Sequence, residues 1–171
     1  WGEAMNVART VQEFEDAGVA GMHLEDQVNP KRCGHLDGKE VVSTAEMVKR
    51  ISAAVKGRRD SNFVLCARTD SRAKEGLDAA IDRAKAYADA GADLIFPEAM
   101  SDLGEFEAMA NALDVPILAN MTEFGKSELF TTEQLANAGV KLVIYPGTTL
   151  RIAMGAVSYT HLRAHETPEH L

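Results

Sequence analysis

The sequence predicts an α/β fold, a (β/α)8 TIM-type barrel that is truncated, with about five βα units present. Three segments share one pattern, in which an alanine-rich amphipathic run ends at a glycine and four to six mostly apolar residues follow. The glycines are Gly18, Gly91 and Gly139. A glycine in this position is typical of a helix C-terminus, and a short apolar run is typical of a buried strand. Helix and strand in alternation predict a parallel sheet.

The first expected strand lies in "EDAGVAGMHLED", which starts at Glu15, and the second in "FVLCART", which starts at Phe63. A helix is predicted between them because Ser43 and Glu46 have the spacing of a capping box. After the second strand, the next helix is predicted from apolar residues at helical spacing, namely Leu77, Ile81, Ala84 and Ala88.

The third strand is expected in "ADAGADLIFPEA" from Ala88, the fourth in "VPILANM" from Val115, and the fifth in "ANAGVKLVIYPG" from Ala136. Thr131 and Gln134 predict a second capping box, which opens the helix between the last two strands. No glycine-rich dinucleotide fingerprint follows any strand. This favours the barrel over an open doubly wound sheet.

A closed barrel needs eight strands and typically about 250 residues, whereas the chain has 171. Residues 1–157 are therefore expected to form a partial barrel domain. Residues 158–171 lose the apolar periodicity and are expected to be an aberrant, non-native tail. Three histidines lie there, His161, His165 and His170, so metal binding is the alternative interpretation of the tail.

The charge balance argues against a nucleic-acid partner. The chain has 18 basic and 26 acidic side chains, a formal net charge of -8, and its basic clusters are short. A surface this acidic repels phosphate backbones. No apolar run approaches the roughly 20 residues that span a bilayer, and no secretory segment opens the sequence, so we expect a cytoplasmic protein and no membrane partner.

Polar residues stand at the expected carboxyl end of every strand, where barrel enzymes place their reactive groups. They are, in chain order, Glu25 and Asp26, then Arg68, Thr69 and Asp70, then Glu98, then Asn120, Thr122 and Glu123, and finally Tyr145. Carboxylates suit a hard cation such as Mg²⁺, while Arg68 and Asn120 suit the carboxylates of an anionic substrate. Strand ends are also polar simply because they leave the core. The pattern therefore indicates a functional site only because it is repeated on five strands.

The loop from Asp26 to Val42 is long for a βα connection and has no periodicity, which is typical of a lid. It carries Cys33 among Lys31, Arg32 and His35. Neighbouring cations lower a thiol pKa from about 8.5, so Cys33 is a candidate for proton transfer. Cys66, the second cysteine, lies in an apolar run and is expected to be inert.

At these residues the sequence resembles the isocitrate lyase and phosphoenolpyruvate mutase superfamily. "HLEDQ" followed by "PKRCGH" is similar to its cysteine-loop signature, in the form of the 2-methylisocitrate lyase branch. The similarity continues through "NVARTV", "ARTDS", "EGLDAAIDRAKAY", "AGADLIFPEA", "VPILANMTEFG" and "YPGTTLR", and covers residues 1 to about 157. The cysteine loop is the specific part, and the other segments are shared across the superfamily.

The resemblance implies a carbon–carbon lyase of the methylcitrate cycle that needs Mg²⁺, with Mn²⁺ as an alternative, and splits 2-methylisocitrate into pyruvate and succinate. It implies that Cys33 protonates the succinate fragment, with Arg68 and His35 as further catalytic residues. Glu25 would help to hold the metal through water. The expected substrate-binding residues are Lys31, Arg32, Gly34, Glu98, Asn120 and Thr122. A tricarboxylate is thus the expected partner, and a homotetramer the expected assembly of the complete chain.

The sequence also departs from the family. The Asp-x-Asp pair of the metal site, a Ser-Gly-Gly substrate loop and the closing C-terminal helices have no counterpart here, and only Trp1-Gly2 remains of a Gly-Trp-Gly turn. Two alternatives stay open. The first is an isocitrate lyase that gives glyoxylate and succinate, although such enzymes usually have Lys-Lys-Cys-Gly-His in place of residues 31–35. The second is an inactive barrel fragment.

Overall fold

A computed structural model describes residues 2–162 of the chain. Its strands are β1 (Gly21–Glu25), β2 (Val64–Thr69), β3 (Leu94–Pro97), β4 (Leu118–Asn120) and β5 (Leu142–Ile144). Its helices are α1 (Ala4–Asp16), α2 (Thr44–Gly57), α3 (Arg72–Glu75), α4 (Leu77–Asp89), α5 (Leu103–Asn111), α6 (Thr132–Asn137) and α7 (Thr148–Val157), with a π-helix at Ser158–Leu162. The predicted alternation of strand and helix is confirmed, and the five strands correspond to part of a TIM-type barrel.

The strands pair in parallel, in the order in which they occur along the chain. β1 pairs with β2, β2 with β3, and β4 with β5. A parallel bridge between Ile95 and Ile117 connects the two groups of strands. The register places Glu25 opposite Arg68 at the carboxyl ends of β1 and β2. Because all strands point the same way, their carboxyl ends share one edge of the sheet.

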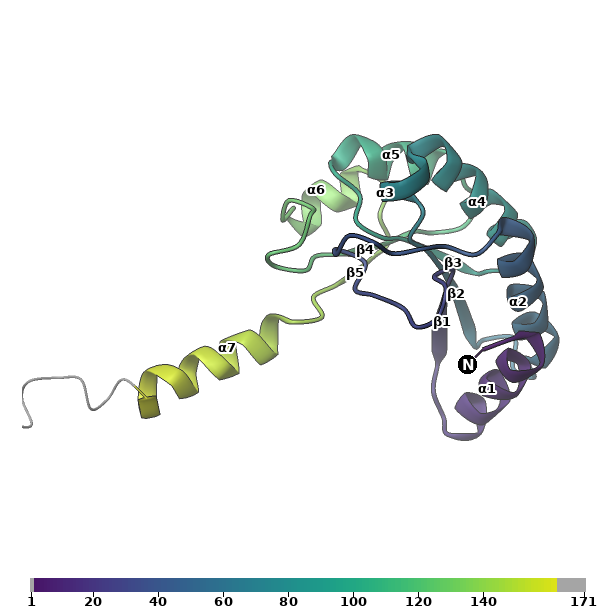
Figure 1. The fold of residues 1–171 in the computed structure, drawn as a ribbon, viewed down its shortest axis with the longest axis horizontal. Coiled ribbons are helices and arrows are strands. Elements are labelled where there is room, and N and C mark those ends of the chain that lie inside the picture. Colours follow the sequence, from purple (N-terminus) through teal and green to yellow (C-terminus); the bar gives the residue numbers. More distant parts are fainter. Residues whose placement is uncertain (1, 163–171) are drawn as a thin grey trace, which may run out of the picture.

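Helices α1 to α6 cover one face of the sheet (Figure 1). All of them except α3 contribute buried apolar residues to a single core on that face, as with Val11 of α1, Ile51 of α2, Tyr87 of α4 and Phe106 of α5. This follows from the sequence, since helical spacing gathers apolar side chains on one side of each helix while the other side stays charged. The core fixes the strands and therefore the positions of the groups at their ends.

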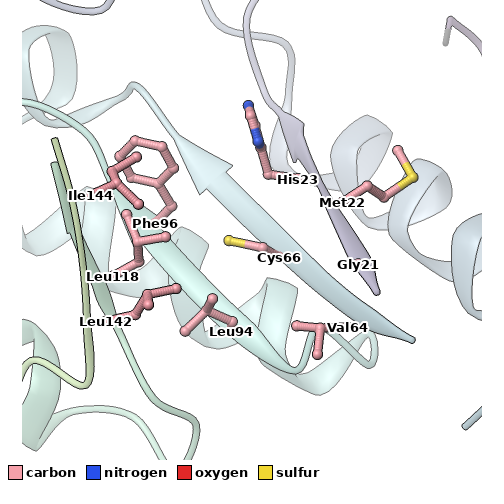
Figure 2. Close-up of a pocket in the computed structure, with 10 residues that line it drawn as sticks. All are labelled: Gly21, Met22, His23, Val64, Cys66, Leu94, Phe96, Leu118, Leu142 and Ile144. Atoms are coloured by element: carbon pink, nitrogen blue, oxygen red, sulfur yellow. The ribbon is translucent and has the colours of Figure 1, made fainter. Parts of the chain in front are cut away.

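The opposite face of the sheet is also apolar but is open within the described part of the chain. Cys66, Leu94, Phe96 and Leu118 are buried there in a second, smaller cluster. Figure 2 shows their side chains on one face of the strands, where they line a hollow of ≈ 270 Å³. Burial raises the pKa of the Cys66 thiol to about 12, so the expectation of an inert cysteine is supported.

The predicted helix ends are confirmed at the three glycines. Gly18, Gly91 and Gly139 have φ of 77°, 101° and 89°, a conformation that residues with a Cβ rarely adopt. Thr131 forms the predicted capping box, with reciprocal hydrogen bonds to Gln134.

The capping box predicted at Ser43 and Glu46 forms only in part. The Ser43 hydroxyl accepts from the backbone N–H of Glu46, but the Glu46 carboxylate binds Arg50 one turn further along α2. The ion pair with Arg50 therefore replaces the second hydrogen bond that the spacing predicts.

α7 extends away from the rest of the domain (Figure 1), and none of its residues is buried. The π-helix continues it to Leu162, so the predicted tail of residues 158–171 is described only in its first five residues. His165 and His170 lie outside the described residues, and the tail stays a prediction. Within residues 2–162, no helix has both the length and the apolar character that a membrane crossing requires.

Candidate active site

The carboxyl ends of β1 to β4 bring four of the predicted site residues together. Glu25 ends β1, Arg68 lies near the end of β2, Glu98 follows β3, and Asn120 ends β4. Glu25, Arg68 and Glu98 are all buried. Charged groups at such depth are stable only when they are paired, so their contacts define the site.

Arg68 lies at the centre of these contacts. Its guanidinium donates Nε to Asp70 Oδ2 at 2.9 Å and Nη2 to Asp70 Oδ1 at 3.1 Å. It also lies 3.3 Å from Glu25 Oε2 and 3.3 Å from Glu98 Oε1, and its Cζ is 5.0 Å from the centre of the Phe96 ring. The two hydrogen bonds and the ring hold the guanidinium in one plane.

Burial alone would lower the pKa of Arg68, but the hydrogen bonds with Asp70 and the charges of Asp70, Glu98 and Glu25 raise it above its ordinary value. Burial alone would raise the pKa of Asp70, yet Arg68 and Lys39 hold it below its ordinary value. Both groups are therefore charged at neutral pH, and the positive charge of Arg68 is what an anionic substrate requires.

The long loop after β1 folds over the strand ends. Lys31 Nζ donates to Glu25 Oε2 at 2.9 Å. Gly34 lies so close to β2 and β3 that a Cβ there would be 2.2 Å from Glu98 Oε1 and 2.5 Å from Arg68 Nη2. Only glycine allows this approach, which gives a physical reason for the glycine that follows the cysteine.

His35 joins the loop to the segment after β4. Its Nδ1 accepts from the backbone N–H of Lys126 at 2.9 Å, so the ring proton is placed on Nε2. Nε2 is 3.5 Å from Glu98 Oε1, and it is buried without a hydrogen bond among the described residues. A buried donor without an acceptor is unfavourable, so this atom is available to an incoming acceptor.

Asn120 and Thr122 extend the cluster toward β4. Asn120 Nδ2 donates to Glu98 Oε2 at 3.3 Å, and the Thr122 hydroxyl donates to Asn120 Oδ1 at 2.7 Å. Both residues are partly exposed. Their polar atoms can therefore reach a ligand as well as each other.

Two predicted residues of the loop do not join this cluster. The Cys33 side chain is exposed, and in residues 2–162 it makes no hydrogen bond to the strand-end groups. The Arg32 side chain is exposed as well, and only its backbone is bound, by Gln27. The structure thus places Cys33 directly beside Gly34 and the site, with its side chain accessible to solvent.

Lys39 and Gln27 belong to the site region but were not predicted from the sequence. The Lys39 side chain, 4% exposed, binds Asp70 and the carbonyl of Gly34. The side chain of the buried Gln27 binds the backbone of Arg32. Lys39 and Asp70 are 31 residues apart, so no local pattern indicates their pairing. Asp70 was expected at the end of the second strand, and the structure shows it there, bound to Arg68.

A further buried carboxylate, that of Asp26, supports the site. Asp26 accepts from the Thr69 hydroxyl at 2.8 Å, from the Asp70 backbone N–H at 2.8 Å and from the Tyr87 hydroxyl at 2.9 Å. Burial raises the pKa of Asp26 despite these hydrogen bonds. Asp26 therefore ties the end of β1 to the end of β2, next to Arg68.

The described residues do not form a metal site by themselves. Mg²⁺ takes six oxygen ligands, several of them usually waters. Within residues 2–162, no group of three or more His, Cys, Asp or Glu side chains is placed to share a metal ion. Glu25 has the right donor chemistry, but its Oε2 already binds Lys31 and lies 3.3 Å from Arg68. One carboxylate can be a ligand here, but it is not a complete site.

The arrangement can bind a small polyanion beside an accessible thiol. Arg68 presents donors from β2, Lys31 and His35 present donors from the loop after β1, and Asn120 of β4 adds an uncharged amide. Carboxylates are recognised by such groups through charge-assisted hydrogen bonds. The loop that carries the thiol is packed against the same strand ends, so a bound ligand and Cys33 would be neighbours.

The chain is similar in sequence to a known family and to several named proteins. Residues 1–164 match the family model described as phosphoenolpyruvate phosphomutase. A probable 2-methylisocitrate lyase 2 of Corynebacterium glutamicum is 66% identical over 157 residues, which are 92% of this chain and 51% of that protein. The 2-methylisocitrate lyase of Salmonella typhimurium is 52% identical over 170 residues, 98% of this chain and 58% of that protein. The chain thus spans about half the length of the curated relatives it matches.

Solved structures agree with the fold. An oxaloacetate acetylhydrolase in complex with the inhibitor 3,3-difluorooxalacetate superposes with a TM-score of 0.92 at 40% identity, covering 100% of this chain and 60% of that one. A 2,3-dimethylmalate lyase gives 0.91 at 36% identity, covering 97% and 56%. A phosphonopyruvate hydrolase in complex with oxalate and Mg²⁺ gives 0.80 at 30% identity, covering 96% and 57%.

Proposed function

Because this chain belongs to the phosphoenolpyruvate phosphomutase family, we propose that the full-length protein is a carbon–carbon lyase that cleaves 2-methylisocitrate to pyruvate and succinate. The full-length protein means the natural polypeptide that carries this sequence. The observation that carries the proposal is the packing of the Lys31–His35 loop on the strand ends, where Gly34 contacts the Arg68–Glu98 pair and places Cys33 beside it. Relatives named 2-methylisocitrate lyase, at 66% and 52% identity, support the choice of substrate.

In this reaction the proton of the substrate hydroxyl is removed and its oxygen becomes the carbonyl of pyruvate. The adjacent carbon–carbon bond breaks, and its electron pair stays on the succinate fragment. That carbon must then receive a proton. Cys33 is the proposed donor, because it is a free and exposed thiol next to the strand-end cluster.

Substrate carboxylates are proposed to bind Arg68, Asn120 and the Nε2 of His35. Arg68 offers a fixed guanidinium, and His35 offers a buried donor that lacks an acceptor among the described residues. Lys31, Arg32 and Gly34 would carry and close the loop, while Glu98 and Thr122 line the pocket. A tricarboxylate has enough negative charge to engage several of these donors at once.

For the metal the proposal is Mg²⁺, with Mn²⁺ as the alternative. The related phosphonopyruvate hydrolase structure contains Mg²⁺ with oxalate. Glu25 would supply one ligand through water, but the described residues do not complete the coordination shell. No step of the reaction is therefore assigned to the metal. The predictions of a cytoplasmic location and of a homotetramer belong to the same proposal.

The test is to incubate the purified full-length protein with 2-methylisocitrate in D2O and to identify the products by NMR, with Mg²⁺ and with EDTA. The expected result is pyruvate and succinate that carries one solvent-derived deuterium, with loss of turnover in EDTA. Glyoxylate from isocitrate at a higher rate would favour an isocitrate lyase. No product from either substrate would favour an inactive protein.

A further inference from the structure

The cysteine loop is fixed immediately before Cys33 by the side chain of Gln27. Gln27 Oε1 accepts from the backbone N–H of Arg32 at 2.9 Å, and Gln27 Nε2 donates to the carbonyl of Arg32 at 2.9 Å. Gln27 is 1% exposed and pairs with Val41 in an antiparallel bridge. Both backbone groups of the residue before the cysteine are therefore held by one buried amide.

The loop is fixed immediately after Cys33 by Lys39. Its ammonium donates to the carbonyl of Gly34 at 2.8 Å and to Asp70 Oδ1 at 3.1 Å. The Lys39 side chain is 4% exposed, and a charge at this depth needs partners to be tolerated. The same Asp70 carboxylate holds the guanidinium of Arg68.

Cys33 is exposed, so no packing around its own side chain holds it in place. Its position depends on its two neighbours in the chain, and both are bound by side chains anchored at strand ends. Gln27 follows β1, and Asp70, which holds Lys39, follows β2. A proton donor must be held within hydrogen-bond reach of the atom that it protonates, so such anchors matter for rate.

We infer that Gln27 and Lys39 are positioning residues that fix the Cys33 thiol over the strand ends, and that Lys39 links the cysteine loop to Arg68 through Asp70. The role of the thiol rests on the proposed function. The two anchors rest only on the contacts above. Neither residue touches the reacting atoms, and each acts through the backbone on one side of Cys33.

The chain offers a matched control at the opposite end of the strands. Arg58 Nη1 donates to the carbonyl of Phe63 at 3.0 Å and to Asp93 Oδ2 at 2.6 Å. Like Lys39, it is a cation that bridges a backbone carbonyl and a carboxylate. Phe63 and Asp93 precede β2 and β3, so this bridge lies away from the cysteine loop. Arg58→Met thus removes an equivalent interaction without releasing the loop.

The first readout is limited trypsin digestion of the folded full-length protein at the exposed Lys31 and Arg32. Loss of a buried hydrogen bond to a charged group favours local opening, so Lys39→Met should speed cleavage there by about tenfold or more. Gln27→Met should do the same without leaving a buried charge, which preserves the test if Lys39→Met does not fold. Lys39→Arg should restore part of the protection, and Arg58→Met should leave loop cleavage unchanged.

The second readout is steady-state kinetics with 2-methylisocitrate. A misplaced proton donor slows chemistry more than binding, so Lys39→Met and Gln27→Met should lower kcat by about tenfold or more and leave KM nearly unchanged. Unchanged cleavage in the folded variants would overturn the anchors. Faster cleavage with wild-type kcat would overturn the link to Cys33. If the wild-type protein has no lyase activity, the proposed function fails, while the cleavage rates still decide on the anchors.

Discussion

Arg68 and Asp70 face each other across two hydrogen bonds, from Nε to Oδ2 and from Nη2 to Oδ1. A guanidinium bound in this way has a fixed plane, because two of its nitrogens, Nε and Nη2, donate to one carboxylate. The ring of Phe96 lies against the same guanidinium. The proposed contact between Arg68 and a substrate carboxylate therefore depends on residues from β3 and from the end of β2.

Arg68→Lys should impair substrate binding although the charge is kept. An ammonium cannot make the paired hydrogen bonds to Asp70 and still present a flat donor surface to a ligand. Loss of a charge-assisted hydrogen bond predicts a KM about 10 to 100 times higher in steady-state assays of the full-length protein. Arg72→Lys is the matched control, since Arg72 makes a bidentate contact with Glu105 away from the site. Equal effects of the two changes would contradict the role of Arg68.

Cys33→Ser should nearly abolish turnover and leave substrate affinity largely intact. The hydroxyl is a far weaker acid than the thiol, and general acid catalysis contributes about 10² to 10⁴ in rate. The measurement is kcat together with the dissociation constant from titration calorimetry. Cys66→Ala is the control, because Cys66 lies in the apolar cluster on the open face of the sheet and not at the strand ends. Unchanged kcat in Cys33→Ser would remove Cys33 from the acid role.

Gly34→Ala should displace the cysteine loop without unfolding the domain. The added methyl carbon would lie 2.2 Å from Glu98 Oε1 and 2.5 Å from Arg68 Nη2, which is closer than any stable contact. We expect kcat to fall by about 100-fold, the cost of a 1 Å misplacement of catalytic groups. Thermal unfolding should change little, because the loop can lift away from the core. Gly155→Ala in α7, where a Cβ meets open space, should change neither property.

The sequence predicted the alternating fold and the C-terminal ends of three helices because these depend on local signals. The glycines at 18, 91 and 139 require a backbone conformation that only their own residue type favours, and the structure has it. The assembly of Glu25, Arg68 and Glu98 at one edge follows from parallel strands, since each lies at the end of its own strand.

The roles of Lys39 and Gln27 could not be predicted from local patterns. Lys39 looks like any surface lysine in a polar loop, and its burial appears only when the loop folds onto Asp70. The exposure of the Cys33 side chain likewise depends on the loop conformation. Sequence spacing indicates which residues are near the strand ends, whereas side-chain direction depends on tertiary packing.

Asp70→Asn should change the dependence of stability on pH. Burial raises the pKa of Asp70, but Arg68 and Lys39 outweigh this and hold it below its ordinary value. The folded chain therefore binds this proton less readily than the unfolded chain, and Asp70 stabilises the fold above about pH 4. That contribution is lost as the pH falls through the folded pKa. The measurement is the free energy of unfolding in urea from pH 7 to pH 2. At pH 7 the variant should be less stable than the wild-type protein, and below pH 4 it should lose less unfolding free energy than the wild-type protein does.

Asp26→Asn should change the pH dependence of stability in the opposite direction to Asp70→Asn. Burial raises the pKa of Asp26, so the folded chain binds this proton more readily than the unfolded chain. Asp26 alone makes the fold more stable as the pH falls from its folded pKa toward about 4. Its removal should make the loss of stability in acid steeper. If both variants change the loss of unfolding free energy in acid in the same direction, the two pKa shifts do not have opposite signs.

The sharpest test of the proposed lyase activity is the ratio of kcat/KM for 2-methylisocitrate to that for isocitrate, measured on the full-length protein with Mg²⁺ while the released 2-oxo acid is followed. We expect a clear preference for the methylated substrate and loss of activity with a chelator. A preference for isocitrate, or no turnover of either substrate, would contradict it.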